Sequence, residues 1–410
     1  MISDESQLKS MTAESQIPIA SHTISKRFAA ALALVYGTGF GLVGTHLPFF
    51  PVWLKAVGVD AAWIGIITAV PAVTRFTTLP FVTSFVERRQ ALRGGIIAMA
   101  FLTSFGLAAV GLQRETVPIF LAYAATCCVW TPMAPLVDAY ALGGVRQYGL
   151  RYGRLRLWGS AAFVVGALAC GSLIDVIAAR YLIWIIAGMA ALSALVSVGL
   201  KPLAPLKSNP AALAGGSVLL RDFGFLAIII ASALIQSSHS AYYVVASIVW
   251  QQEGFGGLTI AGLWTLGVLA EIVVFAASPR FTLPPATLVI IAACCAVVRW
   301  IITALAPPIS VLAIVQLMHG MTFGLTQVGA MGLMVHHVPG HIMARGQGYL
   351  AAFSGIATGS AYILTGVIFA RYGQNVYYVM ALIAAMGAAV MLFAHRGLAD
   401  HQPHRAGSGG

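Results

Sequence analysis

Charged residues are scarce in this sequence, and their scarcity excludes an ordinary soluble domain. Only 9% of the 410 residues are Asp, Glu, Lys or Arg, and 59% are hydrophobic, whereas soluble domains have about 25% charged and roughly 45–50% apolar residues. The mean hydropathy is +0.89. We therefore predict an integral membrane protein with little polar surface.

Several chemical signatures are also missing. The sequence has no glycine-rich phosphate loop, so we expect no use of ATP within this chain. Its cysteines lack the spacing of metal ligands, and we interpret them as packing residues in apolar segments; they are Cys127, Cys128, Cys170, Cys294 and Cys295. The net charge of +11 comes from loop residues rather than from a nucleic-acid patch. We expect no cofactor, no metal and no nucleic-acid partner.

One short histidine motif invites an enzyme hypothesis. His336, His337 and His341 resemble a histidine box of membrane di-iron oxygenases, but Pro339 and Gly340 break the helix that would align them. We expect a cytoplasmic loop here and no enzyme.

Runs of about 20 apolar residues predict twelve membrane-spanning helices. They lie near residues 28–54, 61–86, 94–112, 117–142, 157–179, 181–200, 223–250, 258–278, 286–306, 309–336, 344–369 and 374–394.

The spans divide into two bundles of six helices. The predicted parts are a disordered cytoplasmic N-terminus (1–27), an N-terminal six-helix bundle (28–200), a cytoplasmic central loop (201–222), a C-terminal six-helix bundle (223–394) and a cytoplasmic tail (395–410).

Basic loop residues predict the orientation. Lys55, Arg114, Arg180 and Arg371 lie on one side, and the many other basic loop residues lie with both termini and the central loop. The positive-inside rule places both termini in the cytoplasm and the protein in the inner, or plasma, membrane.

The two halves repeat short motifs. Val52-Trp53 recurs as Val249-Trp250, and the tripeptide at 179–181 recurs at 370–372. A parallel repeat of two six-helix halves is a known plan of transporters, which bind substrate between the halves near the bilayer midplane.

Five ionisable residues lie within or near the ends of apolar spans: Arg75, Asp138, Glu271, Arg299 and His319. A charge at the bilayer centre costs about 2.5–3.5 kcal/mol on insertion scales. Such residues usually line a polar path for a substrate or proton, so a transporter is the first hypothesis. Buried structural ion pairs are the alternative.

Two further groups are candidate binding residues. Asp138 and Arg156 face each other across a predicted helical hairpin, where a carboxylate and a guanidinium could hold a polar ligand; a solvated loop arginine is the alternative for Arg156. Tyr242 and Tyr243 follow His239 in mid-helix and could stack on an aromatic ring. The alternative for the tyrosines is packing or interface anchoring.

The hairpin motifs carry a family resemblance. The sequence Ala-Pro-Leu-Val-Asp at 134–138, followed by Tyr-Gly-Arg-Leu-Arg at 152–156, resembles the lactose permease-type symporters of the major facilitator superfamily. The resemblance implies the all-helical major facilitator fold, with twelve membrane-spanning helices in two six-helix pseudo-repeats. It also implies matches to that family's sugar-binding acid and arginine, its stacking aromatic, and its eighth-, ninth- and tenth-helix polar residues; these are Asp138, Arg156, Phe163, Glu271, Arg299 and His319.

Other motifs resemble the phenylpropionate permease family of the same superfamily. They are Arg-Leu-Arg-Leu-Trp-Gly-Ser at 154–160, His-Ser-Ala-Tyr-Tyr at 239–243, Leu-Ala-Glu at 269–271 and Val-Arg-Trp at 298–300. This resemblance implies proton-coupled uptake of a small aromatic carboxylate such as 3-phenylpropionate. The implied substrate-binding residues are Arg75, Asp138, Arg156, Phe163, His239, Tyr242, Tyr243 and Arg299.

The proton site departs from the lactose permease pattern. Thr322 stands where that family has an acid three residues after the tenth-helix histidine. We therefore expect Glu271 to carry the proton, with Asp138 as the second candidate. Arg299 or His319 could favour the charged form of Glu271 when paired with it.

We predict a secondary active transporter, a proton symporter that works by alternating access. We expect it to be monomeric, with a small-molecule substrate, protons and the lipid bilayer as its partners. A sugar or nucleoside symporter is the alternative, and a membrane sensor that binds without transporting is a further one.

Overall fold

The computed structural model describes residues 19–148, 150, 152–203, 216–339 and 342–400, and these residues form helices and short connections without a strand. The α-helices are α2 (Ile19–Ala56), α3 (Ala61–Phe76), α4 (Thr78–Arg88), α5 (Leu92–Leu112), α6 (Thr116–Trp130), α7 (Met133–Tyr148), α8 (Tyr152–Ile174), α9 (Leu182–Ser197), α10 (Phe223–Ser237), α11 (Ser240–Gln252), α12 (Gly257–Ala277), α13 (Pro285–Ala304), α14 (Ile309–His319), α15 (Leu325–His337), α16 (Met343–Tyr372) and α17 (Val376–Asp400).

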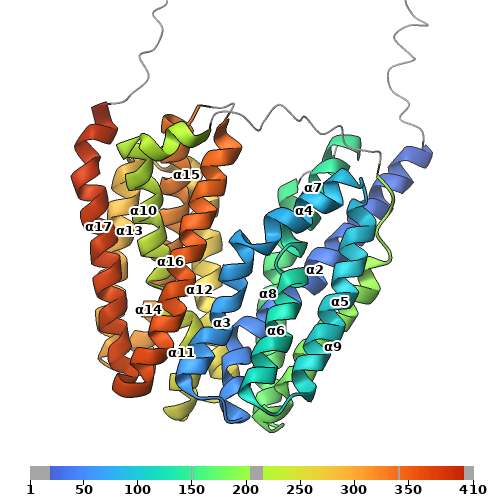
Figure 1. Cartoon of the computed structure of the whole chain (residues 1–410), viewed down its shortest axis with the longest axis horizontal. Helices are drawn as coiled ribbons and strands as arrows, with labels where there is room; N and C mark the ends of the chain where they lie inside the picture. Colours follow the sequence, from blue (N-terminus) through green and yellow to red (C-terminus); the bar gives the residue numbers. More distant parts are fainter. Residues whose placement is uncertain (1–18, 149, 151, 204–215, 340–341, 401–410) are drawn as a thin grey trace, which may run out of the picture.

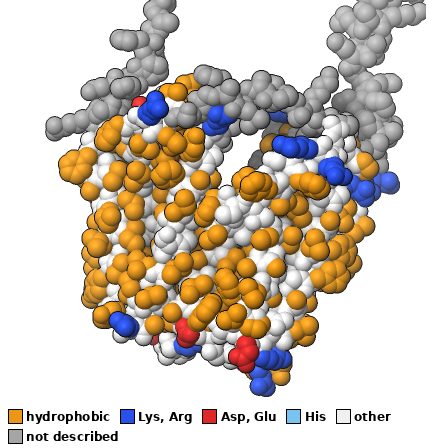
Figure 2. Space-filling view, in the orientation of Figure 1, with side chains coloured by type: hydrophobic (Ala, Val, Ile, Leu, Met, Phe, Trp, Pro, Cys, Tyr) orange, Lys and Arg blue, Asp and Glu red, His pale blue; other side chains and the backbone are white. Residues whose placement is uncertain are grey.

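The helices form two bundles, α2–α9 and α10–α17, which stand side by side (Figure 1). The bundles converge at one end and separate at the other, where α2 begins and α17 ends. We call these the closed end and the open end. Figure 2 shows a hollow between the bundles at the open end and hydrophobic side chains over their flanks.

The flanks suit a lipid environment. Large apolar side chains such as Phe81 and Phe393 are 77% and 85% exposed. Within the described residues, nine helical stretches are long and apolar enough to span a membrane, or ten if the bent pair α3 and α4 is one span. One of the nine, Arg345–His395, contains both α16 and α17, and the apolar part of α8 is shorter, at Trp158–Ile174. The helical membrane fold is confirmed, while the number of twelve spans stays a prediction.

Several predicted spans are broken near their middles. The predicted helix 61–86 bends by 43° at Thr77, and 117–142 divides into α6 and α7. The predicted helix 309–336 passes through a π-helix, η5 (Gly320–Gly324). Such breaks free backbone groups and are frequent at functional sites.

The break between α10 and α11 has a local cause. The hydroxyls of Ser237, Ser238 and Ser240 donate to the carbonyls of Leu234, Ile235 and Ser237, three residues earlier in each case. These bonds offer the backbone carbonyls an alternative to the helical ladder. The predicted single span 223–250 is therefore two helices.

Glycines hold the closed end together. A Cβ atom on Gly366 of α16 would lie 2.5 Å from the carbonyl oxygen of Ala61 in α3, and one on Gly171 of α8 would lie 2.5 Å from the carbonyl oxygen of Gly257 in α12. Both contacts join the N-terminal bundle to the C-terminal bundle. Small residues allow such close approach of helices in lipid.

Candidate functional site

A cavity of about 620 Å³ lies between the two bundles. Residues of α2, α3, α6 and α7 form its N-terminal wall, and residues of α10, α11, η5, α15 and α16 form its C-terminal wall. Its size is that of a pocket for a small organic molecule.

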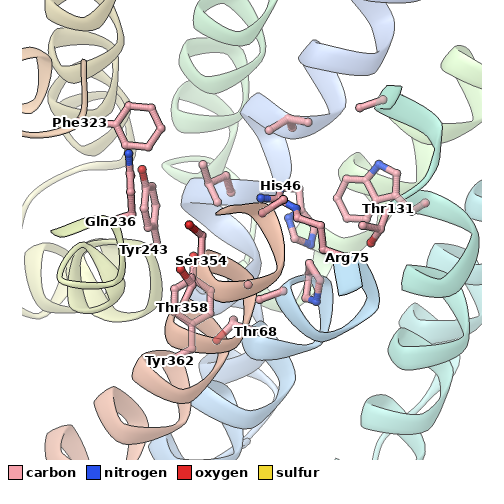
Figure 3. Close-up of a pocket in the computed structure, with 18 of the residues that line it drawn as sticks. His46, Thr68, Arg75, Thr131, Gln236, Tyr243, Phe323, Ser354, Thr358 and Tyr362 are labelled. Carbon is pink, nitrogen blue, oxygen red and sulfur yellow. The ribbon is translucent and has the colours of Figure 1, made fainter. Parts of the chain in front are cut away.

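Arg75 gives the cavity its charge. It lies in the last turn of α3, just before the bend at Thr77. Among the described residues that line the cavity, it is the only Lys, Arg, Asp or Glu. Its side chain is exposed to the cavity and reaches toward the same region as His46 (Figure 3). None of the described lining residues is a carboxylate that would neutralise it.

Aromatic rings build much of the N-terminal wall. The rings of His46 and Phe50 stack with centroids 4.5 Å apart, and Phe50 stacks on Tyr123 at 4.6 Å. His46 Nε2 lies 3.1 Å from the hydroxyl of Tyr123, and Trp130 meets His46 edge-on at 4.7 Å. This wall therefore offers a surface of aromatic rings beside one guanidinium.

The C-terminal wall is neutral and rich in hydrogen-bonding groups. Figure 3 shows Gln236, Tyr243 and Phe323 on the far side of the cavity from Arg75. Further polar lining residues of this bundle are Ser232, Gln327, Gln347, Ser354, Thr358 and Tyr362.

A second cluster is buried within the C-terminal bundle, outside the cavity wall. Arg299 of α13 is 0% exposed and donates from Nη1 to Thr322 and from Nη2 to Gln316, at 3.1 and 3.2 Å. The same Nη1 lies 3.0 Å from His319 Nδ1, while His319 Nε2 lies 3.8 Å from Glu271 Oε2.

The arginine fixes the state of this histidine. A guanidinium has only donors, so His319 Nδ1 must accept and carries no proton. His319 is therefore neutral in this arrangement, with its proton on Nε2, directed at Glu271. A second proton on His319 would require the bond to Arg299 to break.

His239 extends the cluster to the break between α10 and α11. Its Nδ1 lies 3.1 Å from the carbonyl of Ile235 and must donate, and in the neutral ring Nε2 then accepts from the Thr322 hydroxyl at 3.0 Å. The guanidinium carbon of Arg299 lies 5.0 Å from the ring of Tyr242 and 4.5 Å from that of Trp300. Rings and neutral acceptors thus stabilise the buried cation.

The predicted hairpin site is only partly described. Asp138 of α7 accepts a 2.6 Å hydrogen bond from the hydroxyl of Tyr36 in α2. Arg156 belongs to α8, but its side chain lies outside the described residues. Phe163 is 6% exposed and its backbone packs against Gly44 of α2. The pairing of Asp138 with Arg156 stays a prediction.

The structure thus separates the predicted site residues into groups. Arg75 and Tyr243 line the cavity. His239, Tyr242, Arg299 and His319 form the buried cluster, and the half-buried Glu271 lies at its edge. Asp138 and Phe163 belong to neither group. Sequence reasoning did not single out the cavity residues His46, Ser232, Gln236 and Tyr362 as ligands. Neutral side chains within apolar spans give no signal comparable to a charge.

Comparison with known proteins gives the family. Residues 30–393 match the profile of the MFS_1 like family. The chain belongs to this family. It is therefore a major facilitator transporter and not an enzyme, as predicted.

The similar sequences are transporters. The chain is 29% identical over 360 residues to the "Probable 3-phenylpropionic acid transporter" of Escherichia coli (strain K12), a match that covers 86% of this chain and 94% of the relative. It is 24% identical over 369 residues to the maltose permease of Geobacillus stearothermophilus, covering 88% and 92% of the two chains. The predicted relation to phenylpropionate permeases is confirmed.

Solved structures share the fold. The nucleoside transporter NupG superposes with a TM-score of 0.77 at 14% identity, covering 90% of this chain and 98% of that one. A bacterial homologue of the human lysosomal transporter Spinster, in an inward-facing and unoccupied conformation, gives 0.69 at 13% identity, with 93% and 99% covered. At these identities the likeness concerns the fold alone.

Proposed function

We propose that this transporter is a proton-coupled symporter that takes up a small aromatic carboxylate, such as 3-phenylpropionate, by alternating access. The observation that carries the proposal is the charge of Arg75, which has no acidic counterpart among the described residues of the cavity wall. A cation at membrane depth is costly without a counter-charge. A monoanionic substrate supplies one, and a guanidinium binds a carboxylate with two parallel hydrogen bonds.

The aromatic wall supports the ring of the proposed substrate. His46, Phe50, Tyr123 and Trp130 present ring faces and edges within the same cavity as Arg75. A carboxylate on the arginine and a phenyl group among these rings would use both features of the N-terminal wall.

The buried cluster supports Glu271 as the proton carrier. Because Arg299 occupies His319 Nδ1, the histidine cannot take a second proton without loss of that bond, whereas a carboxylate beside the Nε2 proton can be neutral or charged. Proton binding at Glu271 would thus change the charge of the cluster by one unit. Asp138 remains the second candidate.

The basic loops support a cytoplasmic open end. Arg93 at the start of α5 donates from Nε to the carbonyl of Leu200 at 2.7 Å, so the loops before α5 and after α9 lie on one side. With both termini in the cytoplasm of a cell whose inner membrane holds the protein, as the positive-inside rule predicts, the cavity would open to the cytoplasm.

A sugar or nucleoside symporter is the second candidate. The glutamines, serines and threonine of the C-terminal wall favour a substrate with several hydroxyl or carbonyl groups. The relatives include a maltose permease, and a nucleoside transporter shares the fold.

The test is uptake of radiolabelled 3-phenylpropionate into vesicles that contain the purified protein, with and without an inward proton gradient. We expect accumulation above the external concentration only with the gradient. Accumulation of maltose or uridine in its place would contradict the aromatic-acid assignment, and binding without accumulation of any of these would indicate a sensor.

A further inference from the structure

Within the part of the chain that the structure describes, two polar groups of α10 lack hydrogen-bond partners where α10 borders the cavity. Ser232 is 2% exposed, and its hydroxyl oxygen has no partner among the described residues. The amide nitrogen of Gln236 is likewise enclosed and unpartnered. Both residues nevertheless line the cavity. Enclosed polar groups are nearly always paired, so two such groups on one wall require an explanation.

The two groups form one surface. Residues four apart lie on the same face of a helix, so Ser232 and Gln236 stand one turn apart on α10. They belong to the C-terminal bundle, and Arg75 belongs to the N-terminal bundle. Figure 3 shows Gln236 and Arg75 on opposite sides of the cavity.

The chemistry of Gln236 allows it to serve a ligand. The carboxamide carries an acceptor and two donors on a terminal bond that rotates freely, so a half-turn brings either group toward the cavity. The hydroxyl of Ser232 donates one hydrogen bond and accepts others. Together they fit a phenolic hydroxyl, which also donates and accepts.

We propose that the substrate is an aromatic carboxylate with a hydroxyl group on its ring, and that Ser232 and Gln236 bind this hydroxyl while Arg75 binds the carboxylate. This inference rests on the proposed function, because it assigns a second subsite in the same cavity. The aromatic rings of the N-terminal wall accommodate the phenyl group. A plain phenyl group would leave both polar groups of α10 unpaired, which lowers its affinity.

The experiment measures dissociation constants by isothermal titration calorimetry on the purified full chain in detergent. The probes are 3-phenylpropionate, 3-(4-hydroxyphenyl)propionate, 3-(3-hydroxyphenyl)propionate and uridine. We expect one of the hydroxylated acids to bind about tenfold more tightly than 3-phenylpropionate, a factor typical of one hydrogen bond in an enclosed site.

Variants connect the preference to α10. Gln236→Leu should abolish the tenfold preference, because the ring hydroxyl loses its amide partner and the plain acid no longer leaves that amide unpaired. Ser232→Ala, a smaller change, should also reduce the preference for the hydroxylated acid. Gln251→Leu, at an exposed position at the end of α11, is the matched control and should keep it.

The outcomes separate this inference from the proposed function. Equal affinity for hydroxylated and plain acids, or a preference that survives both α10 variants, overturns the inference and leaves aromatic-acid transport intact. Binding of uridine without binding of any aromatic acid overturns both.

Discussion

At the scale of single residues, charge divides this protein into two polar centres with different tasks. Arg75 faces the cavity without an acid among the described wall residues, whereas Arg299 is enclosed by rings and neutral acceptors. Both interrupt apolar spans, and the family resemblance implied that both bind substrate. Exposure to the cavity distinguishes them, and hydropathy carries no information on it.

Glu271→Gln tests the role of the buried cluster. The amide cannot change its charge, so we expect loss of uphill, gradient-driven uptake with retention of substrate exchange across the membrane. Both can be measured with labelled 3-phenylpropionate in the same vesicles. Uphill uptake by the variant would remove Glu271 from the proton-carrying role, and Glu253→Gln, at the loop after α11, is a control that should transport normally.

At the scale of elements, the breaks in the helices position the functional side chains. Arg75 precedes the bend between α3 and α4, His239 occupies the break between α10 and α11, and Phe323 belongs to η5. Hydropathy predicted the apolar spans because each contains about 20 apolar residues. It could not predict these breaks, which depend on serine hydroxyls and on contacts between helices distant in sequence.

Gly320→Ala tests the contact that sets the position of η5. A Cβ atom there would lie 2.6 Å from the carbonyl carbon of Ala270 in α12, directly before Glu271. We expect a loss of stability of about 1–3 kcal/mol from overpacking, measured as a lower melting temperature in detergent. Gly262→Ala is the matched control, because nothing lies within 4 Å of its Cβ position. An unchanged melting temperature for Gly320→Ala would show that η5 and α12 can separate at no cost.

At the scale of the whole molecule, helix packing holds the two bundles together at the closed end, with α3 against α16 and α8 against α12. Besides the glycine contacts, the carboxylate of Asp175 at the end of α8 accepts hydrogen bonds from the backbone nitrogens of Gly257 and Leu258, at 2.6 and 3.3 Å. A carboxylate at a helix N-terminus gains from the helix dipole. Asp175 thus links the N-terminal bundle to α12 of the other.

Asp175→Ala should weaken this link and populate a state in which the bundles separate at the closed end. The loss of one charge-assisted interaction, about 1–2 kcal/mol, is enough to shift a two-state population several-fold. Spin labels at Lys55 and Gln252, both exposed and in different bundles, would report a longer distance by electron paramagnetic resonance, with the exposed Cys294 replaced by Ser. An unchanged distance distribution would contradict the assignment of Asp175 to the closed end.

The whole-molecule plan was the part most accessible from sequence. Long apolar spans, a polar centre between two sets of helices and the motifs around Asp138 and Glu271 were enough to predict the major facilitator fold. The composition of the cavity was not accessible, because Gln236, Ser232 and His46 come together only when the two bundles pack.

The central claim is that the lone cationic charge of Arg75 selects a carboxylate, and one measurement tests it most directly. Binding of 3-phenylpropionate and of its uncharged amide should be compared by calorimetry in the unmodified protein and in Arg75→Gln. We predict that the variant loses about 10- to 100-fold in affinity for the acid, the worth of a hydrogen bond to a charged group, and little for the amide. Equal losses for the acid and the amide, or none for either, would contradict the account.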